Sequence, residues 1–400
     1  MTSALIVGGD SDHNLGDAAI LAALCHCLAR SRLRPAITIT SAITSAMSGQ
    51  RRGAGNGKAL PGVERTISRS WRDVLSSARE QDLVVVGGGG LFQDDDSRVK
   101  MPYWAARLAA LRLVNRNLVG HCVGAGPLRH PESRGFARLV CRALRSITVR
   151  DRFARDSLAG CNDTPIEIVP DPAFMLPPAP ADQGAAFIRA CNLDPRRPLI
   201  GVALRRWFHP LGGFIPHRWR ARSPGNARRG RAELAMLLEE VAIALRRLAH
   251  RLDAAVLLMP TYNVAHEGDA EVCRQLIARL PDVRVELARI VDPSLYKSVA
   301  GHLSLMLSAR MHPLILAAGM GVPIVGLAYN GKFAALFELL RLPPRLIALD
   351  DFAAGPQACR LELHALSALV DGPDLAQRSA ELAAQVESRT LSLFESGGAS

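Results

Sequence analysis

The chain has 400 residues, of which 48% are hydrophobic and 22% are charged, a composition that is typical of a folded enzyme and excludes a disordered chain. This length exceeds what one ordinary hydrophobic core supports, so we expect two domains. The formal net charge of +12 favours anionic ligands such as phosphate, a nucleotide, nucleic acid or a membrane surface. Only four of the 49 basic residues are lysines, and arginine binds carboxylate and phosphate with paired hydrogen bonds. A GC-rich genome would also explain this arginine content.

The eight cysteines are scattered and include no C-x-x-C pair, so we expect buried thiols in a reducing cytoplasm and no zinc site. The N-terminus shows neither a basic region nor a cleavage site, and we therefore do not expect secretion. Residues 313–329 form an uncharged stretch of 17 residues that begins with Pro313 and contains Pro323 and three glycines. A membrane span needs roughly 20 apolar residues, so we expect a buried helix, a turn and a buried strand here.

The first half of the chain alternates between strand and helix patterns. The apolar run Ala4–Val7 precedes a Gly/Asp/Asn loop at 8–17 and a helical pattern over 18–28, which is the opening unit of a Rossmann-like sheet. Residues 46–66 have no periodicity and are predicted to form a surface loop. Because strands alternate with helices, we expect a parallel sheet. Its further strands are predicted at 83–86, 118–119 and 147–149.

The second half repeats this alternation after a stretch rich in proline and alanine, which marks a domain boundary. The predicted fold class is α/β, with two Rossmann-like domains that face a cleft and bind ligands at the carboxyl ends of their strands. The predicted strands of the second domain are 199–203, 255–258, 283–285 and 324–327. The predicted divisions are an N-terminal domain at 1–176, a linker at 177–198, a C-terminal domain at 199–360 and a helical tail at 361–400.

Four glycines, Gly87–Gly90, follow the buried strand at 83–86. Glycine allows the backbone to approach a ligand closely and exposes N–H groups to an anion. We therefore take Gly88, Gly89 and Gly90 as candidate phosphate contacts. A tight turn between a strand and a helix explains the same glycines equally well.

A second candidate site surrounds Arg310 and His312, which lie in a strongly apolar stretch. No Asp or Glu occurs from Pro293 through Phe337, although this span contains Arg310, His312 and Lys332. Burying an arginine without an anionic partner is unfavourable. The pattern therefore predicts a small, highly charged anion as the ligand. The alternative is that Arg310 pairs with a carboxylate from another segment.

Basic side chains also follow the strand at 199–203. Arg205 and Arg206 lie where ligands bind in such sheets, so we expect at least one of them to face the cleft. Residues 206–231 form an arginine-rich segment with several aromatic residues, which we predict to be a long loop. Such a segment suits peripheral contact with a membrane-bound sugar phosphate through residues 205–231. A disordered basic loop remains the alternative. No nucleic-acid-binding signature is present.

Seven short motifs, taken together in order and spacing, resemble the polysaccharide pyruvyltransferase family, and they lie between residue 5 and about residue 340. The arginine-rich segment after Trp207 has no counterpart in this resemblance. The motifs are Asn14–Asp17, Val86–Asp94, Gly124–Pro127, Thr148–Asp151, Pro170–Phe174, Ser308–His312 and Gly321–Lys332.

The resemblance implies a glycosyltransferase-B-like scaffold that moves the pyruvyl group of phosphoenolpyruvate, as a ketal, onto a sugar of a cell-surface or exopolysaccharide precursor. The acceptor would be a sugar or a lipid-linked oligosaccharide, at the cytoplasmic face of the inner membrane. By this resemblance His312 is the acid/base residue, while Arg310 and Arg205 hold the carboxylate and phosphate of the donor. Lys332 matches a family lysine, and no cofactor or metal is expected. Further cleft candidates are Asn14, Asp17, Asp94 and Arg206.

Two alternatives remain open at this point. A sugar-nucleotide-dependent glycosyltransferase could use the same scaffold, but many such enzymes have an acidic residue in the helix before a G-x-P turn. The corresponding helix here, 313–320, has no acidic residue. A non-catalytic partner in glycan assembly is the other alternative, although Arg310, His312 and Lys332 together favour an enzyme.

Overall fold

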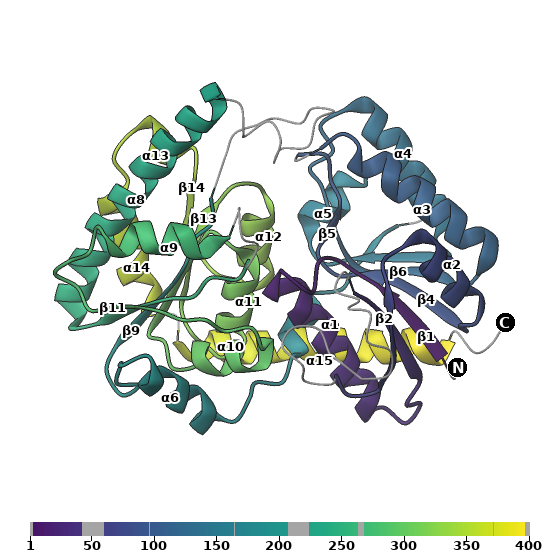
Figure 1. The fold of residues 1–400 in the computed structure, drawn as a ribbon, viewed down its shortest axis with the longest axis horizontal. Helices are drawn as coiled ribbons and strands as arrows, with labels where there is room; N and C mark the ends of the chain where they lie inside the picture. Colours follow the sequence, from purple (N-terminus) through teal and green to yellow (C-terminus); the bar gives the residue numbers. More distant parts are fainter. Residues whose placement is uncertain are drawn as a thin grey trace. The chain divides into compact units, whose positions relative to one another are not determined.

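The computed structural model describes residues 3–41, 60–95, 97–163, 165–206, 224–262, 268–370 and 372–396. The described residues form two compact units. Unit 1 comprises 3–176 and 382–396, and unit 2 comprises the described residues between 177 and 381. Each unit contains a parallel sheet with helices on both of its faces (Figure 1). The predicted α/β class with two Rossmann-like domains is therefore confirmed.

The sheet of unit 1 has the spatial order β3-β2-β1-β4-β6-β7-β8, and β5 pairs with β6 beside this path. All of these pairs are parallel. Every residue of β4 is buried, as expected for an apolar strand that is covered on both faces. The strands are β1 (Ser3–Val7), β2 (Ala36–Ser41), β3 (Val63–Ser68), β4 (Leu83–Gly87), β5 (Gly90–Phe92), β6 (Leu118–Ala125), β7 (Ser146–Val149) and β8 (Glu167–Ile168).

Helices α2, α3 and α4 pack on one face of this sheet, and their apolar residues join one core cluster with the strands. Helix α1 and the end of α15 lie on the other face (Figure 1). The helices of unit 1 are α1 (Leu15–Arg30), α2 (Trp71–Arg79), α3 (Lys100–Val114), α4 (Pro131–Ala143), α5 (Arg152–Ser157), the short 3-10 helix η1 (Pro172–Met175) and the C-terminal part of α15 (Gly372–Ser396).

The sheet of unit 2 has the order β11-β10-β9-β12-β13-β14, again with parallel pairs throughout. The central strands β9 and β12 are completely buried, which leaves only their ends available to a ligand. The strands are β9 (Leu199–Ala203), β10 (Ala255–Leu258), β11 (Val285–Leu287), β12 (Leu305–Ser308), β13 (Ile324–Ala328) and β14 (Leu346–Ala348).

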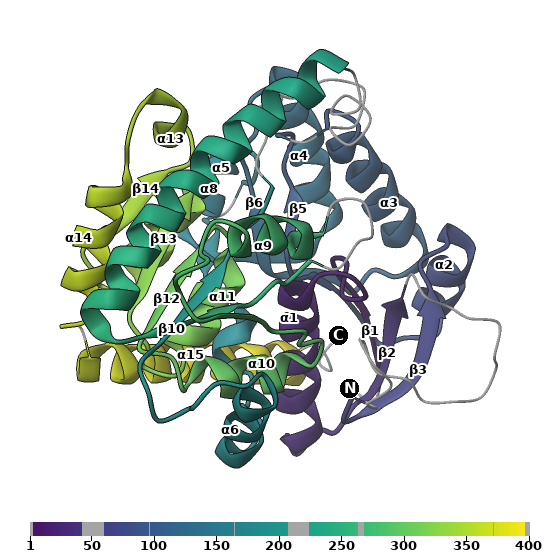
Figure 2. The ribbon, with the colours of Figure 1, turned by 60° about the vertical axis from the view of Figure 1, so that its left-hand side comes forward.

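Helices α8, α9, α13 and α14 of unit 2 share one core cluster on one face of this sheet, and α10, α11 and α12 follow the strands on the other face. Figure 2 shows this arrangement from a second direction. The helices are α6 (Ala181–Ala190), α8 (Pro224–Leu252), α9 (Asp269–Ile277), α10 (Pro293–Ala300), α11 (Met311–Ala318), α12 (Lys332–Leu339), α13 (Asp351–Ala354), α14 (Ala358–Ala368) and the start of α15.

Some segments differ from the sequence-based expectation. Strand β3 occupies the end of the predicted 46–66 loop, because a partly exposed edge strand carries polar residues that mask its period. Residues 224–231 of the predicted basic loop begin α8, where Pro224 takes the first helical position that suits proline. Residues 42–59 and 207–223 lie outside the described residues. Within the predicted linker, residues 181–190 form α6.

All eight cysteines are free. Six are buried as predicted, but Cys191 is half-buried and Cys359 is exposed on α14. The predicted sequence of a buried helix, a turn and a strand over 313–329 is confirmed by α11 and β13. Within the described ranges, no helix combines the length and apolar character that crossing a bilayer requires.

Candidate functional site

The carboxyl edge of the unit 2 sheet gathers most of the predicted site residues. Strands β9, β12 and β13 are neighbours, and Ser308 at the end of β12 is paired in register with Ala203 and Gly326. Neighbouring strands are about 4.8 Å apart. The segments that follow these strands therefore start side by side. They carry Arg205 after β9, Arg310 and His312 after β12, and Lys332 after β13.

Arg310 is held by an acidic residue from a distant segment. Its Nε donates to Oδ2 of Asp269 over 3.1 Å and its Nη2 donates to Oδ1 over 2.5 Å. Asp269, the first residue of α9, is completely buried. Its Oδ2 also accepts hydrogen bonds from the backbone N–H groups of Thr261 and Tyr262, which follow β10. The carboxylate is thus fixed before any ligand binds.

The structure therefore shows the alternative that the sequence left open, in which Arg310 pairs with a carboxylate from another segment. The span from Pro293 through Phe337 has no acidic residue, but the partner lies 41 positions before Arg310 in the sequence. Parallel topology brings the start of α9 beside the end of β12, although no local pattern indicates this contact. Asp269 is the site residue that sequence reasoning missed.

The ion pair fixes Arg310 without covering its whole guanidinium group. Burial alone would lower the pKa of Arg310, but the adjacent Asp269 carboxylate raises that pKa above its usual value, so the side chain stays charged. The guanidinium also lies over the Tyr262 ring, 5.3 Å from its centre. Among the residues that the structure describes, none is hydrogen-bonded to Nη1, and 19% of the side chain is exposed. This edge of the guanidinium can therefore reach an anionic ligand.

His312 is the second residue of α11, half-buried at the amino end of that helix. The first turn of α11 contains no acidic residue, and its N-cap Arg310 makes no side-chain capping bond. Helix α12 likewise begins without an acidic residue, and its N-cap Gly331 has no side chain to cap it, although the side chain of Asn330 accepts from the first N–H of the helix. Helix N-termini carry partial positive charge and unpaired N–H groups. Both helices therefore add to a positive potential around His312.

Two further cations of this edge are also fixed in place. The guanidinium of Arg205 lies over the Tyr329 ring, 4.5 Å from its centre, and Tyr329 packs edge-on against Phe333. Lys332, the first residue of α12, is buried, and its backbone N–H donates to the side chain of Asn330. Such cation–π contacts hold a flexible arginine in one orientation. The structure thus brings Arg205, Lys332 and the Arg310–His312 segment to one edge.

Arg206 lies at the same strand end but is oriented toward α9. Its charge contributes to lowering the pKa of Glu271 in α9, after the hydrogen bonds from Gln275 and Arg274. Arg206 is half-buried. Because its charge acts on Glu271, we place it beside the cluster of Arg205, Arg310 and Lys332 rather than within it.

The corresponding edge of unit 1 has a different character. Gly88 and Gly89 have φ angles of +83° and +73°, a left-handed conformation that favours glycine. The carbonyl of Gly89 accepts a hydrogen bond from the N–H of Gly124 on β6. A Cβ atom on Gly89 would lie 2.4 Å from Oδ1 of Asp17. The glycines therefore allow a carboxylate to pack directly against the loop.

Asn14 lies in the loop just before α1, and Asp17 lies in the first turn of that helix. Asn14 caps that helix by accepting from the N–H of Gly16, and its amide donates to Asp17 over 3.2 Å. The carboxylate of Asp17 also accepts from the N–H of Asp10 over 2.8 Å. The structure thus brings Asn14, Asp17 and the glycine loop together. The carboxylate makes this edge less favourable for a phosphate than the edge of unit 2.

The carboxylate of Asp94 has a structural role and is not open to a ligand. It is completely buried, and its two oxygens accept from the N–H groups of Arg129 and His130 over 2.9 and 3.0 Å. Both oxygens are therefore committed to fixing the turn before α4. The predicted placement of Asp94 in a cleft is not supported by this geometry.

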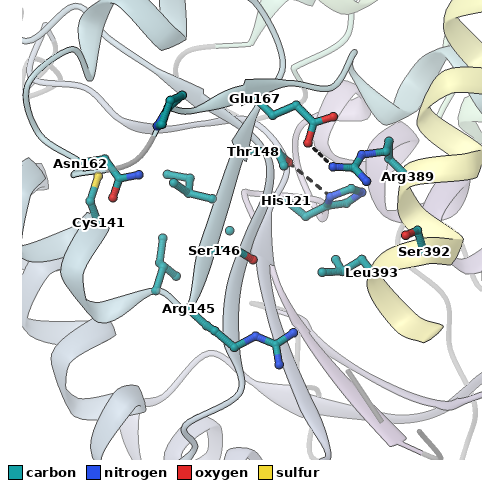
Figure 3. A pocket seen from close by; sticks show the side chains of 14 residues that line it. His121, Cys141, Arg145, Ser146, Thr148, Asn162, Glu167, Arg389, Ser392 and Leu393 are labelled. Carbon is teal, nitrogen blue, oxygen red and sulfur yellow. Dashed lines mark hydrogen bonds and ion pairs between the residues drawn. The ribbon is translucent and has the colours of Figure 1, made fainter. Parts of the chain in front are cut away.

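Unit 1 also contains a cavity of about 340 Å³, shown in Figure 3. It is lined by Gly120 and His121 of β6, by residues 146–148 of β7 and by the end of α15. Its polar side chains contact one another: His121 lies within hydrogen-bond distance of Thr148 and Thr390, and Arg389 pairs with Glu167. Burial, followed by the charge of Arg389, lowers the pKa of His121 to about 4, so the imidazole is neutral. The predicted site residues do not line this cavity.

Residues 14–331 match the family model for polysaccharide pyruvyl transferase, which covers most of the chain. The chain belongs to the polysaccharide pyruvyl transferase family. The predicted family is therefore confirmed, and because the family is one of enzymes, the chain is an enzyme. No curated protein sequence matches this family member significantly.

Solved structures show the fold of this family member. Sucrose-phosphate synthase from Thermosynechococcus elongatus is similar with a TM-score of 0.58, at 12% identity and with 98% of each chain covered. UDP-GlcNAc 2-epimerase from Methanocaldococcus jannaschii, in complex with UDP-GlcNAc and UDP, gives 0.55 at 12% identity, covering 98% of this chain and 99% of that chain. The Neisseria meningitidis UDP-GlcNAc 2-epimerase gives 0.52 at 11% identity, with 97% and 100% covered. These likenesses show a glycosyltransferase-B-like fold.

Proposed function

We propose that this enzyme transfers the pyruvyl group of phosphoenolpyruvate onto two hydroxyls of a sugar in a cell-surface glycan precursor. The observation that carries the proposal is the cluster at the carboxyl edge of unit 2. Arg205, Arg310 and Lys332 lie there with His312, at two helix N-termini that lack acidic residues. Phosphoenolpyruvate presents a carboxylate and a phosphate, and arginine recognises both groups.

The charge balance of the cluster supports a donor with several negative charges. Asp269 is the acidic residue that contacts Arg310, and the ion pair between them consumes its charge. Arg205 and Lys332 add two further cationic side chains beside the two helix N-termini. A donor that carries a carboxylate and a phosphate complements this positive potential better than a neutral sugar does. We therefore assign the donor to the edge of unit 2.

The glycine loop of unit 1 is not part of this assignment. The sequence suggested Gly88, Gly89 and Gly90 as donor contacts, but Asp17 packs against Gly89. A carboxylate at that distance would repel a phosphate in the same place. We therefore propose a structural role for these glycines, in which they accommodate Asp17.

The reaction needs one proton delivered to the donor carbon and two attacks by hydroxyl groups, each of which releases a proton. In our proposal His312 takes up one of these protons and the leaving phosphate takes up the other. In our proposal, His312 delivers a proton to the methylene carbon C3 of the donor, and C2 becomes electrophilic. A sugar hydroxyl attacks C2 and loses its proton, and the C2–O bond to phosphate then breaks, with the electron pair leaving on phosphate. A second hydroxyl attacks C2, loses its proton and closes the ketal. One histidine can serve first as general acid and then as general base.

The arginines act on the same steps through electrostatics. Charge develops on the leaving phosphate as the C2–O bond breaks, and pre-oriented cations stabilise such charge without reorganising. Arg310 is oriented by Asp269 and Arg205 by Tyr329 before the donor arrives. In the part of the chain that the structure describes, no group of three or more His, Cys, Asp or Glu residues is arranged to hold a metal ion. Activity without a divalent metal remains a prediction.

The proposal is tested by measuring phosphate release from phosphoenolpyruvate by the purified enzyme, with and without extracted lipid-linked glycan precursors. Mass spectrometry of the glycan should show the mass of a pyruvyl ketal. Release that depends on the acceptor, with an equal amount of ketal formed, is the expected result. If no precursor supports release while a nucleotide sugar is consumed, the enzyme is a sugar-nucleotide-dependent glycosyltransferase instead. Addition of a chelator should leave the rate unchanged.

A further inference from the structure

Helix α3 of unit 1 is apolar on its outer face as well as on its inner face. Its inner face buries Met101, Trp104 and Leu108 in the core. A surface helix normally carries charged residues on the opposite face. Here the outer stripe consists of Val99, Tyr103, Ala106, Ala110 and Leu113. These positions follow the helical period and lie within about 40° of one line along the helix.

This stripe is exposed to a degree that is unusual for large apolar side chains. Leu113 is 88% exposed, Val99 50% and Tyr103 41%. Helix α3 contains no acidic residue at all. Contiguous exposed apolar surface of this kind marks an interaction site.

One end of the stripe is aromatic and held in place. Trp71, at the start of α2, is partly exposed and packs edge-on against Tyr103, with ring centres 6.0 Å apart. Arg107 lies over both rings and donates a hydrogen bond to the hydroxyl of Tyr103. Trp and Tyr side chains are typical of the zone where a bilayer meets water, because their rings are apolar and their edges polar. These two aromatic residues are thus oriented before any contact forms.

Helix α4 lies beside α3 on the same face of the sheet (Figures 1 and 2) and exposes a row of cations. Arg134, Arg138 and Arg142 recur every four residues and are all exposed. Glu132 is the acidic residue of α4, and it pairs with Arg98 over 3.6 Å. Together α3 and α4 contain six basic residues and one acidic residue, which gives a net charge of +5. The apolar stripe and the basic row therefore lie on neighbouring helices, and Arg138 of the row donates to the carbonyl of Gly160 over 3.2 Å.

We propose that this surface, formed by α3, α4 and the start of α2, docks onto an anionic phospholipid bilayer. Apolar and aromatic side chains would enter the headgroup region while the arginines contact lipid phosphates. A second copy of the chain is a poorer occupant, because two-fold pairing would bring the arginine rows together. This inference goes beyond the proposed reaction and does not depend on it.

The surface differs from the one that the sequence suggested. The arginine-rich segment 205–231 was the expected membrane contact, and its residues 207–223 lie outside the described residues. The α3–α4 surface consists entirely of described residues, and it combines exposed apolar side chains with a net positive charge. Substitutions that test this surface can therefore be placed at residues whose structure is described.

The test is co-sedimentation of the full chain with vesicles of phosphatidylcholine alone or mixed with phosphatidylglycerol. We expect binding to the mixed vesicles, weakening with added salt, and little binding to phosphatidylcholine. Each basic residue near an anionic surface is worth about a fivefold change in the binding constant. The triple variant Arg134→Glu, Arg138→Glu and Arg142→Glu should therefore bind at least about 100-fold more weakly.

The apolar stripe is tested by Leu113→Ser, which should weaken vesicle binding severalfold. Its matched control is Leu363→Ser on α14 of unit 2, where the side chain is 66% exposed, and this variant should bind like the wild type. Circular dichroism checks that both variants fold. Equal binding to both vesicle types, or equal losses for Leu113→Ser and Leu363→Ser, would overturn the proposal. The proposal would also be overturned if the chain did not bind vesicles and instead formed a dimer, or a complex with an acidic protein, that Leu113→Ser disrupts.

Discussion

The carboxyl edges of the two sheets occupy the same topological position but carry opposite chemistry. In unit 1 the carboxylate of Asp17 packs against the glycine loop, and Asp94 is consumed by backbone N–H groups. In unit 2 the carboxylate of Asp269 is neutralised by its ion pair with Arg310, and the cationic side chains of Arg205 and Lys332 lie at the same edge. The comparison teaches that a Rossmann-like edge does not select its ligand by topology. The side chains that follow the strands decide which edge suits an anion.

The largest expected effect comes from the residue that we assign to proton transfer. His312→Ala should lower kcat by about 10²- to 10⁴-fold, because the donor carbon then lacks its general acid. The measurement is the rate of phosphate release in the presence of the acceptor. The matched control is His302→Ala, since His302 lies just before β12 and His312 just after it. A rate for His312→Ala within a few-fold of the control would remove this histidine from the mechanism.

Removing Asp269 tests whether its buried ion pair with Arg310 stabilises the carboxyl edge of unit 2. Asp269→Ala leaves a buried guanidinium without its partner and should lower the free energy of unfolding by about 3–5 kcal/mol. Urea denaturation measures this difference. The control is Arg197→Ala, which breaks an exposed ion pair with Asp253 and should cost at most about 1 kcal/mol. Similar losses in the two variants would show that the Asp269 pair is not a buried structural anchor.

Acidification tests unit 1 separately. The pKa of His121 is lowered to about 4 from an ordinary 6.5, so the folded state binds fewer protons than the unfolded state between these values. The contribution of this group to stability is therefore complete above about pH 6.5 and is lost as the pH falls toward 4, by about 3 kcal/mol in total. The variant His121→Gln should flatten this part of the stability curve. An unchanged slope in His121→Gln would contradict the account.

The smallest expected effect concerns the glycine loop. Gly89→Ala places a Cβ 2.4 Å from Asp17 at a φ of +73°, which should destabilise unit 1 by about 1–3 kcal/mol. Gly135 lies within α4 with nothing within 4 Å of an added Cβ, so Gly135→Ala should be neutral or stabilising by up to about 1 kcal/mol. Thermal unfolding compares the two. Equal stability of both variants would show that the loop can move away from Asp17.

Much of the fold could be predicted because parallel strands that are buried on both faces are uninterrupted apolar runs. The segments 83–86, 199–203 and 324–327 are of this kind, and each forms a strand. Strand β12 at the centre of unit 2 was not predicted, since its three apolar residues do not stand out in a long apolar region. Edge strands such as β3 were obscured by their polar residues.

The candidate site could be predicted where its residues are close in sequence or directly follow a predicted strand, as Arg205 does. Arg310, His312 and Lys332 follow two neighbouring strands, so a local pattern found them. Asp269 joins them from another crossover, and no period or spacing in the sequence reports such a contact. Asp17 and Asp94 were predicted as cleft residues, but a sequence does not show whether a carboxylate is already satisfied by backbone N–H groups.

The central claim is that the edge of unit 2 holds phosphoenolpyruvate, and equilibrium binding of this donor tests it most directly. Arg205 lies two residues after β9 and Arg197 two residues before it, so Arg205→Ala and Arg197→Ala form a matched pair. A charge-assisted hydrogen bond contributes about 1.5–3 kcal/mol, or about 10- to 100-fold in Kd. We predict a loss of this size for Arg205→Ala and wild-type binding for Arg197→Ala. Wild-type affinity in Arg205→Ala would contradict the assignment of the donor to this edge.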